Sequence, residues 1–188
     1  MTAILKVDTI QDTSGNNIIN ENANTITIGK SGDTVNLASG ATAGFGKVLQ
    51  VVSATDSTLR TTTSTSFVTG SNTLSVSITP SSASNKIFVI VSANIVNGSG
   101  DGIVFATIFR GATNLGEATN GMAMGNSVSG ITPIDHPASI TILDSPSSTS
   151  ALTYQLYFRS NNVSYTASLN GRSSIVTKSS ITAFEIAG

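Results

Sequence analysis

The sequence predicts an all-β protein, an antiparallel β-sandwich preceded by a thin β-rich N-terminal segment. Two observations carry this prediction. Serine and threonine make up about 29% of the 188 residues and are interleaved with valine and isoleucine, as suits pleated strands with one solvated face. The stretch LSVSITP, from Leu74 to Pro80, alternates apolar and hydroxyl side chains, which is the period of a half-buried strand.

Charge and composition exclude several function classes. The chain carries nine basic and ten acidic residues, a net charge of −1, with no cluster of basic residues, so nucleic acid is not an expected partner. No apolar run reaches the length of a membrane span and the N-terminus has no signal-peptide pattern, so we expect no membrane insertion. The absence of cysteine excludes disulfides, zinc–thiolate sites and a cysteine nucleophile.

Residues 1–46 differ in pattern from the rest of the chain. Their apolar residues occur in short runs separated by glycine-containing turns. Ordering a chain costs about 1 to 2 kcal/mol per residue, and so few large side chains cannot offset that cost. We therefore expect this segment to be stabilised by contact with a partner. It would either form a stalk wound from identical copies or dock on a larger particle. Its Gly/Ala-rich end, Ala38 to Gly46, is expected to form a flexible joint.

The remaining residues, 47–188, carry longer alternating stretches that predict eight or nine strands and no amphipathic helix. This number and spacing of strands favour an antiparallel sandwich of jelly-roll type. The expected strands are Val48–Ala54, Ser66–Thr69, Thr73–Thr79, Lys86–Val96, Gly102–Arg110, Ser139–Leu143, Leu152–Arg159, Val163–Leu169 and Ser173–Ile186.

Some of these strands are apolar on both faces. In KIFVIVSANI, which begins at Lys86, Phe88 and Ile90 lie on the face opposite to the main apolar row. A second buried surface must cover that face, either a loop or a neighbouring subunit. If a neighbouring subunit covers that face, we expect a parallel homotrimer. Its expected interface contains Val48, Val52, Phe88, Ile90, Phe184 and Ile186.

Two long motifs carry a resemblance to a known family. The opening ILKVDTIQDTSGNN, followed by NTITIGKSGDTVNLASGATAGFG, resembles the N-terminal stalks of tail-fibre-like virion proteins of tailed, marine-type bacteriophages. The segments SVSITPSSASNKIFVIVSANI, SITILDSPSSTSALTYQLYFRSN and ITAFEIAG resemble the globular domain that follows such stalks, which is similar to the trimeric jelly rolls of the C1q and tumour-necrosis-factor type. The resemblance spans nearly the whole chain. It implies a virion-anchoring stalk over 1–46 and a trimeric jelly roll over 47–188, and it brings no catalytic residues.

Catalytic and metal-binding patterns are sparse. His136 is the only histidine and lies in the proline-flanked stretch PIDHPAS, so we interpret it as a loop residue rather than a catalytic base. Gly29, Lys30 and Ser31 mimic the end of a phosphate-binding loop, but the glycine expected five residues earlier is Asn24. Asp101 lies in a glycine-rich hairpin tip, which is ordinary turn chemistry, although calcium there stays an open alternative. We predict no enzyme activity, no catalytic residues, no metal and no cofactor.

A long irregular connection from Asn114 to Pro137 is the expected recognition loop. The alternative is that its two methionines lie on a short strand and fill the subunit contact. The candidate receptor contacts are Asn120, Met122, Met124, Asn126, Asp135 and His136. Host-surface glycan is the expected ligand class.

The first twelve residues are the candidate virion anchor, because they alternate as a short two-sided strand that would add to another virion protein. Its apolar residues are Ile4, Leu5, Val7 and Ile10. The resulting function is a non-enzymatic homotrimeric tail fibre or adhesin for host attachment, made in the host cytoplasm and located on the virion, with the tail favoured over the capsid. Capsid decoration is the alternative, and an enzyme that cleaves envelope polysaccharide is a third possibility.

Overall fold

The computed structural model describes residues 47–98, 101–127, 134–173 and 175–188, all within one compact unit, Gly44–Gly188. These residues form strands and turns without any helix, and every strand pairing among them is antiparallel. The all-β prediction is therefore confirmed. The candidate anchor residues Ile4, Leu5, Val7 and Ile10, with the rest of the expected stalk, lie outside the described residues.

Thirteen strands are present among the described residues. They are β1 (Val48–Asp56), β2 (Arg60–Thr62), β3 (Ser75–Ile78), β4 (Lys86–Asn97), β5 (Ile103–Arg110), β6 (Thr113–Asn114), β7 (Ala123–Asn126), β8 (Asp135–Asp144), β9 (Leu152–Ser160), β10 (Ala167–Leu169), β11 (Gly171–Arg172), β12 (Ile175–Val176) and β13 (Ser179–Ile186).

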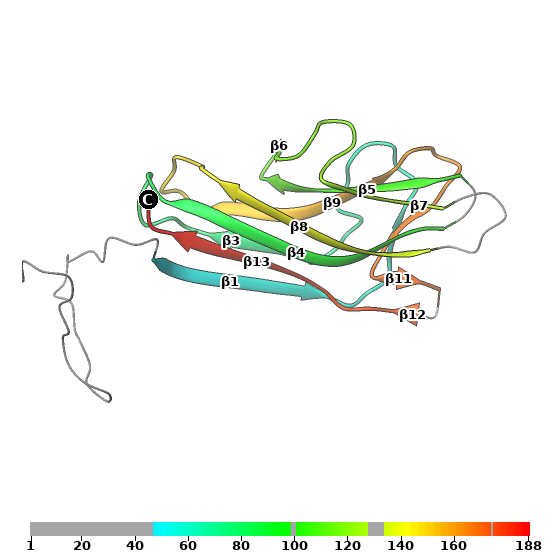
Figure 1. The fold of residues 1–188 in the computed structure, drawn as a ribbon, viewed down its shortest axis with the longest axis horizontal. Helices are drawn as coiled ribbons and strands as arrows, with labels where there is room; N and C mark the ends of the chain where they lie inside the picture. Colours follow the sequence, from blue (N-terminus) through cyan, green and yellow to red (C-terminus); the bar gives the residue numbers. More distant parts are fainter. Residues whose placement is uncertain (1–46, 99–100, 128–133, 174) are drawn as a thin grey trace, which may run out of the picture. The chain divides into compact units, whose positions relative to one another are not determined.

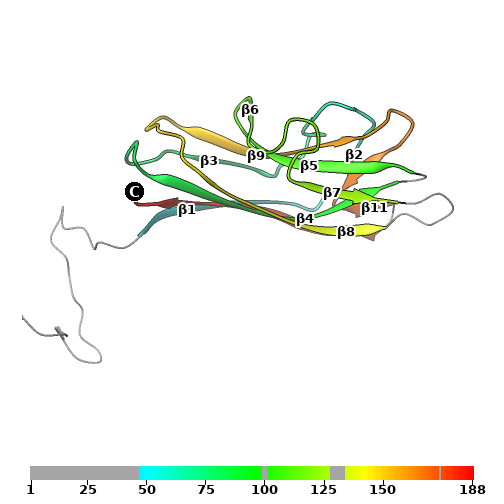
Figure 2. The same cartoon turned by 45° about the horizontal axis from the view of Figure 1, so that its top comes forward.

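The eight main strands form two packed sheets with jelly-roll topology (Figures 1 and 2). The first sheet has the order β8–β4–β13–β1, and the second has the order β3–β9–β5–β7. Successive strands along the chain cross repeatedly between the sheets, which is the winding of two interlocked Greek keys. β4 continues past the point at which β13 begins, and there its last residues pair with β10, which in turn pairs with β2. The first sheet is thereby extended at that end.

The core lies between the sheets because the strands alternate. In β4, the inward residues Ile87, Val89, Val91 and Ile95 are fully buried. They face the inward residues of β9, among them Leu156 and Phe158, across the sandwich. Core positions are therefore supplied by the same β-branched and aromatic residues whose alternation predicted the strands.

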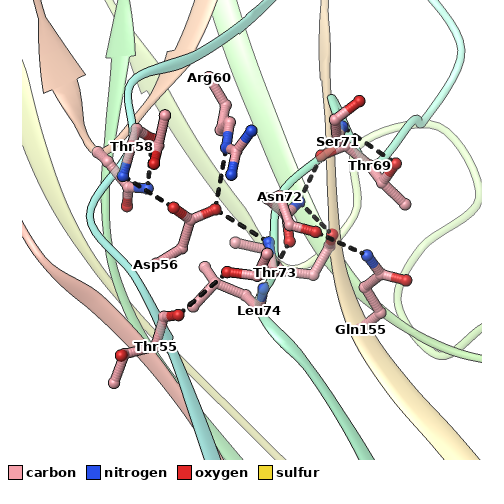
Figure 3. A network of polar contacts seen from close by, with 12 residues as sticks. Thr55, Asp56, Thr58, Arg60, Thr69, Ser71, Asn72, Thr73, Leu74 and Gln155 are labelled. Atoms are coloured by element: carbon pink, nitrogen blue, oxygen red, sulfur yellow. Dashed lines mark hydrogen bonds and ion pairs between the residues drawn. The ribbon is translucent and has the colours of Figure 1, made fainter.

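A buried carboxylate holds one end of the sandwich together (Figure 3). Asp56, at the end of β1, accepts hydrogen bonds from the backbone N–H of Thr58 at 2.8 Å, from that of Thr73 at 2.9 Å and from Nε of Arg60 at 3.0 Å. Burial raises the pKa of Asp56, but these hydrogen bonds outweigh it and the net pKa is lowered. Nearby, Asn72 donates to the Leu156 carbonyl at 3.0 Å and so ties the approach to β3 onto β9.

A second carboxylate, Glu185 on β13, is 1% exposed and closes the opposite end. It accepts bonds from Gln50 Nε2, Asn85 Nδ2 and the Ser81 backbone N–H, each at 2.6 Å, and from the Ser81 hydroxyl at 2.8 Å. Desolvation raises its pKa, but these donors outweigh that effect and lower the pKa to about 2. A buried charge is tolerated there because four donors meet the carboxylate, three at Oε1 and one at Oε2.

A third cluster joins the two sheets on another side. Arg110 on β5 donates to both carboxylate oxygens of Asp144 on β8, at 2.8 and 2.7 Å, and the Tyr154 hydroxyl of β9 donates to Asp144 at 2.6 Å. Burial, followed by the adjacent carboxylate, raises the pKa of Tyr154 far above its ordinary value. The tyrosine therefore acts as a neutral hydrogen-bond donor.

The structure differs from the sequence-based strand assignment in four places. The single strand expected over Ser173–Ile186 is divided into β12 and β13. Ser66–Thr69 forms only an isolated bridge, between Val68 and Phe158. The strand expected over Val163–Leu169 is reduced to Ala167–Leu169. The expected loop Asn114–Pro137 contains β7 and the start of β8, because the edges of β5 and β4 are free to accept them.

Candidate functional site

No metal-binding cluster is present among the described residues. No group of three or more His, Asp or Glu side chains gathers there in a way that could hold a metal ion. His136 Nε2 is 2.8 Å from the Asn126 carbonyl oxygen, and its ring packs so tightly on Gly125 that a Cβ at that glycine would lie 2.5 Å from it. These contacts connect β8 to β7. His136 lies on β8 and not in the loop that the sequence predicted, because β8 pairs with β4 as far as Asp135.

The most distinctive surface is the outer face of the first sheet, which we call the bare face. Cross-strand partners share a face, so the register of the four strands gives its rows directly. The rows are counted from the end at which β1 begins. In the first row, Val48 lies opposite Ile186. The second row runs across all four strands and contains Val51 of β1, Phe184 of β13, Phe88 of β4 and Leu143 of β8.

The apolar residues of the bare face remain open to solvent. Val51 is 52% exposed, Leu143 is 53% exposed and Val48 is 48% exposed. Between Val51 and Leu143, the rings of Phe88 and Phe184 lie with centroids 6.2 Å apart, and both residues are only half-buried. This contiguous apolar row makes the bare face the candidate interaction surface of the described residues.

The bare face changes character along the strands. The third row contains Ser53, Thr182, Ile90 and Thr141, and the fourth contains Thr55, Ser180, Ser92 and Ser139. Further along, the β11–β12 hairpin lies near β4, and its Arg172 Nε donates to Asp135 of β8 at 3.1 Å. The apolar end is thus the end at which β1 begins and β13 finishes, and residues 1–46 precede it in the chain.

Five of the six expected interface residues belong to the bare face, and one does not. Val52 packs against the hydrophobic core, and Val51 occupies the outer row instead. The register shifts between Val48 and Gln50, so that Leu49 is an extra residue in β1. This bulge keeps Val48 in register with the outward Ile186, because a one-residue insertion reverses the alternation of the residues beyond it.

The outer face of the second sheet has the opposite character, and we call it the covered face. The β2–β3 connection (63–74) runs beside β9, where Ser160 N–H donates to the Ser64 carbonyl at 2.8 Å. The β6–β7 connection (115–122) runs beside β5, where Met122 N–H donates to the Ala106 carbonyl at 2.8 Å. The outward side chains of Phe105 and Thr107 on β5 are only 6% and 0% exposed, so the chain itself covers this part of the face.

An arginine joins the two connections. Arg159 of β9 is 8% exposed and donates to the Thr119 carbonyl through Nε at 2.9 Å and through Nη2 at 2.5 Å. Its Nη1 donates to the Thr65 carbonyl at 3.3 Å and to the Ser160 carbonyl at 2.9 Å. The guanidinium carbon is 4.3 Å from the ring centroid of Phe105. Sequence alternation marks Arg159 as an outward residue, but gives no sign of this burial.

The candidate receptor residues do not share one loop. Met122 packs against the core, while Met124 is on β7 and is 63% exposed. Asp135 is in an ion pair with Arg172. Asn120 lies in an exposed turn, where its N–H donates to Glu117, and Asn126 and His136 are joined as described above. The alternative interpretation expected both methionines on a short strand, and the structure places Met124 but not Met122 on one. Whether any of these residues contacts a receptor or a subunit stays a prediction.

In the described part of the chain, no helix has the length and apolar character that a membrane crossing requires.

Comparisons with known proteins identify no family. No family model and no curated protein matches the chain. Among solved structures, the chain is similar to the infectious bursal disease virus Gt strain structure, with a TM-score of 0.38 and 10% identity over 83% of this chain and 42% of that one. It is also similar to a mutant VP2 protein of the same virus, with a TM-score of 0.35 and 11% identity over 81% and 40% of the two chains. The chain spans less than half of each, and likeness at this level carries no functional argument.

Proposed function

We propose that this chain is a non-enzymatic structural protein of a virion, a homotrimeric tail fibre or adhesin that assembles through its bare face. The single observation that supports this most is the exposed row of Val51, Phe184, Phe88 and Leu143. Such a row on a rigid, well-packed sheet favours burial against a partner of matching chemistry. The partner we propose is another copy of this chain.

The position of the bare face favours identical copies arranged in parallel. Its apolar end is where β1 begins, at Val48, and 46 residues precede this unit's described part. Copies related by a rotation axis along the strands would bring their N-terminal segments together, as a stalk wound from identical chains requires. The number three comes from the resemblance to trimeric jelly rolls, and the N-terminal anchor with Ile4, Leu5, Val7 and Ile10 remains part of the proposal.

Light scattering on the full chain tests the assembly. We expect three times the monomer mass of 19.1 kDa at micromolar concentration. The substitution Val51→Ser, combined with Phe184→Ser, should reduce the mass to that of one copy, because it replaces two apolar contacts per subunit with hydroxyls. Both residues lie outside the core, so thermal unfolding of the variant should stay cooperative.

Val163→Ser is the matched control, since Val163 is 67% exposed but is not on the bare face. It should leave the mass of the assembly unchanged. A wild-type chain that stays monomeric and soluble at micromolar concentration would overturn the proposed assembly.

The capsid-decoration alternative uses the same trimer at another place on the particle. Imaging of particles labelled on this protein separates the two functions. A few copies at the tail support the fibre, and many copies tiled over the head support decoration.

A further inference from the structure

The covered face contains a hollow of about 510 Å³ between its two connections. Ser66 and Phe67 line it from the β2–β3 connection, and Ala118 and Thr119 line it from the β6–β7 connection. Phe109 of β5 and Arg159 of β9 line it from the sheet itself. A volume of this size is within the range of small-ligand sites, roughly 300 to 1,000 Å³.

Arg159 differs from the other three arginines of the chain. Arg60, Arg110 and Arg172 are each in an ion pair with an aspartate. The acceptors of Arg159 are three neutral backbone carbonyls. A guanidinium has five N–H groups, and four are used, so one Nη2 hydrogen has no acceptor among the described residues. The side chain is more than nine-tenths buried.

In the part of the chain that the structure describes, no carboxylate forms an ion pair with this cation. Burial lowers the pKa of Arg159, and the charge of Glu117 opposes that effect. A guanidinium nevertheless stays charged in proteins. A buried charge that meets only neutral acceptors is unfavourable compared with one that meets an anion. Arg159 lines the hollow, so an anion bound there would compensate this positive charge and be an acceptor for the remaining N–H.

Aromatic rings supply the apolar part of the hollow. The Phe67 ring meets Phe109 edge-on, with centroids 6.2 Å apart, and Phe109 stacks on Tyr157 at 4.1 Å. Ser66 and Thr119 add hydroxyl groups at the rim. Ring faces beside hydrogen-bonding groups suit a ligand that is itself a ring with C–H faces and hydroxyls.

We propose that this hollow binds the carboxylated ring of an acidic sugar, a hexuronate unit, with the carboxylate placed at the free Nη2 hydrogen of Arg159. The inference deepens the attachment role and rests on the proposed function for the source of the ligand, a surface polysaccharide. The binding chemistry needs only one subunit. It also moves the recognition site away from Asn126 and His136, which lie at the β7 and β8 edge.

The probes are methyl β-D-glucuronide and methyl β-D-glucoside, which differ at the carboxylate. Each is titrated into the full chain, and amide NMR shifts are followed. We expect the glucuronide to bind at least about tenfold more tightly, as a hydrogen bond to a charged group predicts, and to shift the amides of Ser66, Phe67, Ala118 and Thr119. Equal binding of both sugars, no binding of the glucuronide, or equally tight binding of acetate would each overturn the proposal.

Three variants make the test specific while leaving Arg159 in place. Ala118→Trp, in an exposed turn, should fill the hollow and abolish glucuronide binding, whereas Ala151→Trp, an exposed alanine outside the hollow, should not. Glu117→Gln removes the one carboxylate whose charge acts on Arg159 and should tighten glucuronide binding about two- to threefold. An Ala118→Trp variant that still binds the glucuronide as the wild type does would contradict the site.

The outcomes of this test are distinguishable from those of the assembly test. Ala118→Trp should keep the mass of the oligomer, and the Val51→Ser, Phe184→Ser variant should keep glucuronide binding. Loss of sugar binding in the assembly variant would contradict a site built within one subunit.

Discussion

The bare face and the covered face belong to the same sandwich but meet solvent in opposite ways. On the covered face, two connections lie along β9 and β5, and a buried arginine joins them through three hydrogen bonds. On the bare face, a hairpin covers one end only, and the other end exposes valine, leucine and half-buried phenylalanine.

The difference teaches how to separate residues that build the subunit from residues that build an assembly. Phe67, Phe105 and Phe109 on the covered face have partners within the chain. Val51 and Leu143 on the bare face are more than half exposed. We assign to contacts between copies those apolar residues that lie on the outside of a sheet and that the chain itself leaves uncovered.

The largest expected effect comes from the buried carboxylate on which both faces depend. The pKa of Glu185 is about 2 in the folded chain, against an ordinary value of 4.5. Since the folded pKa is lowered, the stabilisation is complete above about pH 4.5 and is lost as the pH falls toward 2, up to about 3 kcal/mol. Thermal unfolding followed from pH 7 to pH 2 should show this loss.

Glu185→Gln should flatten the part of that acid dependence due to Glu185 and leave the part due to Asp56, whose pKa is also lowered. An acid dependence that is identical in the wild type and in Glu185→Gln would show that the buried carboxylate does not hold the sandwich closed.

A smaller effect is expected from Arg159→Met, which acts on the covered face alone. The variant leaves the carbonyls of Thr65 and Thr119 without their donor and should lower the free energy of unfolding by about 2 kcal/mol. Urea unfolding measures the loss. Arg172→Met is the control, because its ion pair is partly exposed and such pairs contribute about 0 to 1 kcal/mol.

Arg159→Met should also speed hydrogen exchange in the two connections without changing the mass of the oligomer. Equal losses of stability for the two arginine variants would remove the distinction between the buried and the exposed arginine.

The smallest expected effect is that of a substitution on the bare face. Thr182 lies in the third row between Ser53 and Ile90, so Thr182→Val would extend the apolar surface by one position without changing side-chain size. We expect association to strengthen by about 0.5 to 1 kcal/mol per copy, measured as a lower concentration for dissociation. Thr153→Val, exposed on the outside of β9, should have no such effect, and equal effects of the two variants would place the contact elsewhere.

Strand existence was predictable wherever alternation was sustained. The expected strands over Lys86–Val96, Gly102–Arg110 and Leu152–Arg159 correspond closely to β4, β5 and β9. The apolar residues on both sides of β4 also pointed to a second covered or partnered surface. These features are local, because a period of two and β-branched side chains specify a pleated strand regardless of its neighbours.

Short strands and edge pairings were not predictable in the same way. β2 and β10 have three residues each, and they pair with each other across more than one hundred residues of sequence. Ser66–Thr69 has the composition of a strand, yet only Val68 forms a bridge, to Phe158. Pairing of such segments depends on which sheet edge the rest of the fold leaves free.

By itself, the sequence determined that this chain is all-β, nearly uncharged, and apolar on more faces than one sandwich core can use. Only the tertiary structure decided that Val51 rather than Val52 faces outward, because a single extra residue in β1 sets the register. It alone decided that Arg159 is buried, because the carbonyls of Thr119 and Thr65 come from segments 40 and 94 residues away. Alternation fixes the side of a strand on which a residue lies, but what covers that side is set by contacts between distant parts of the chain.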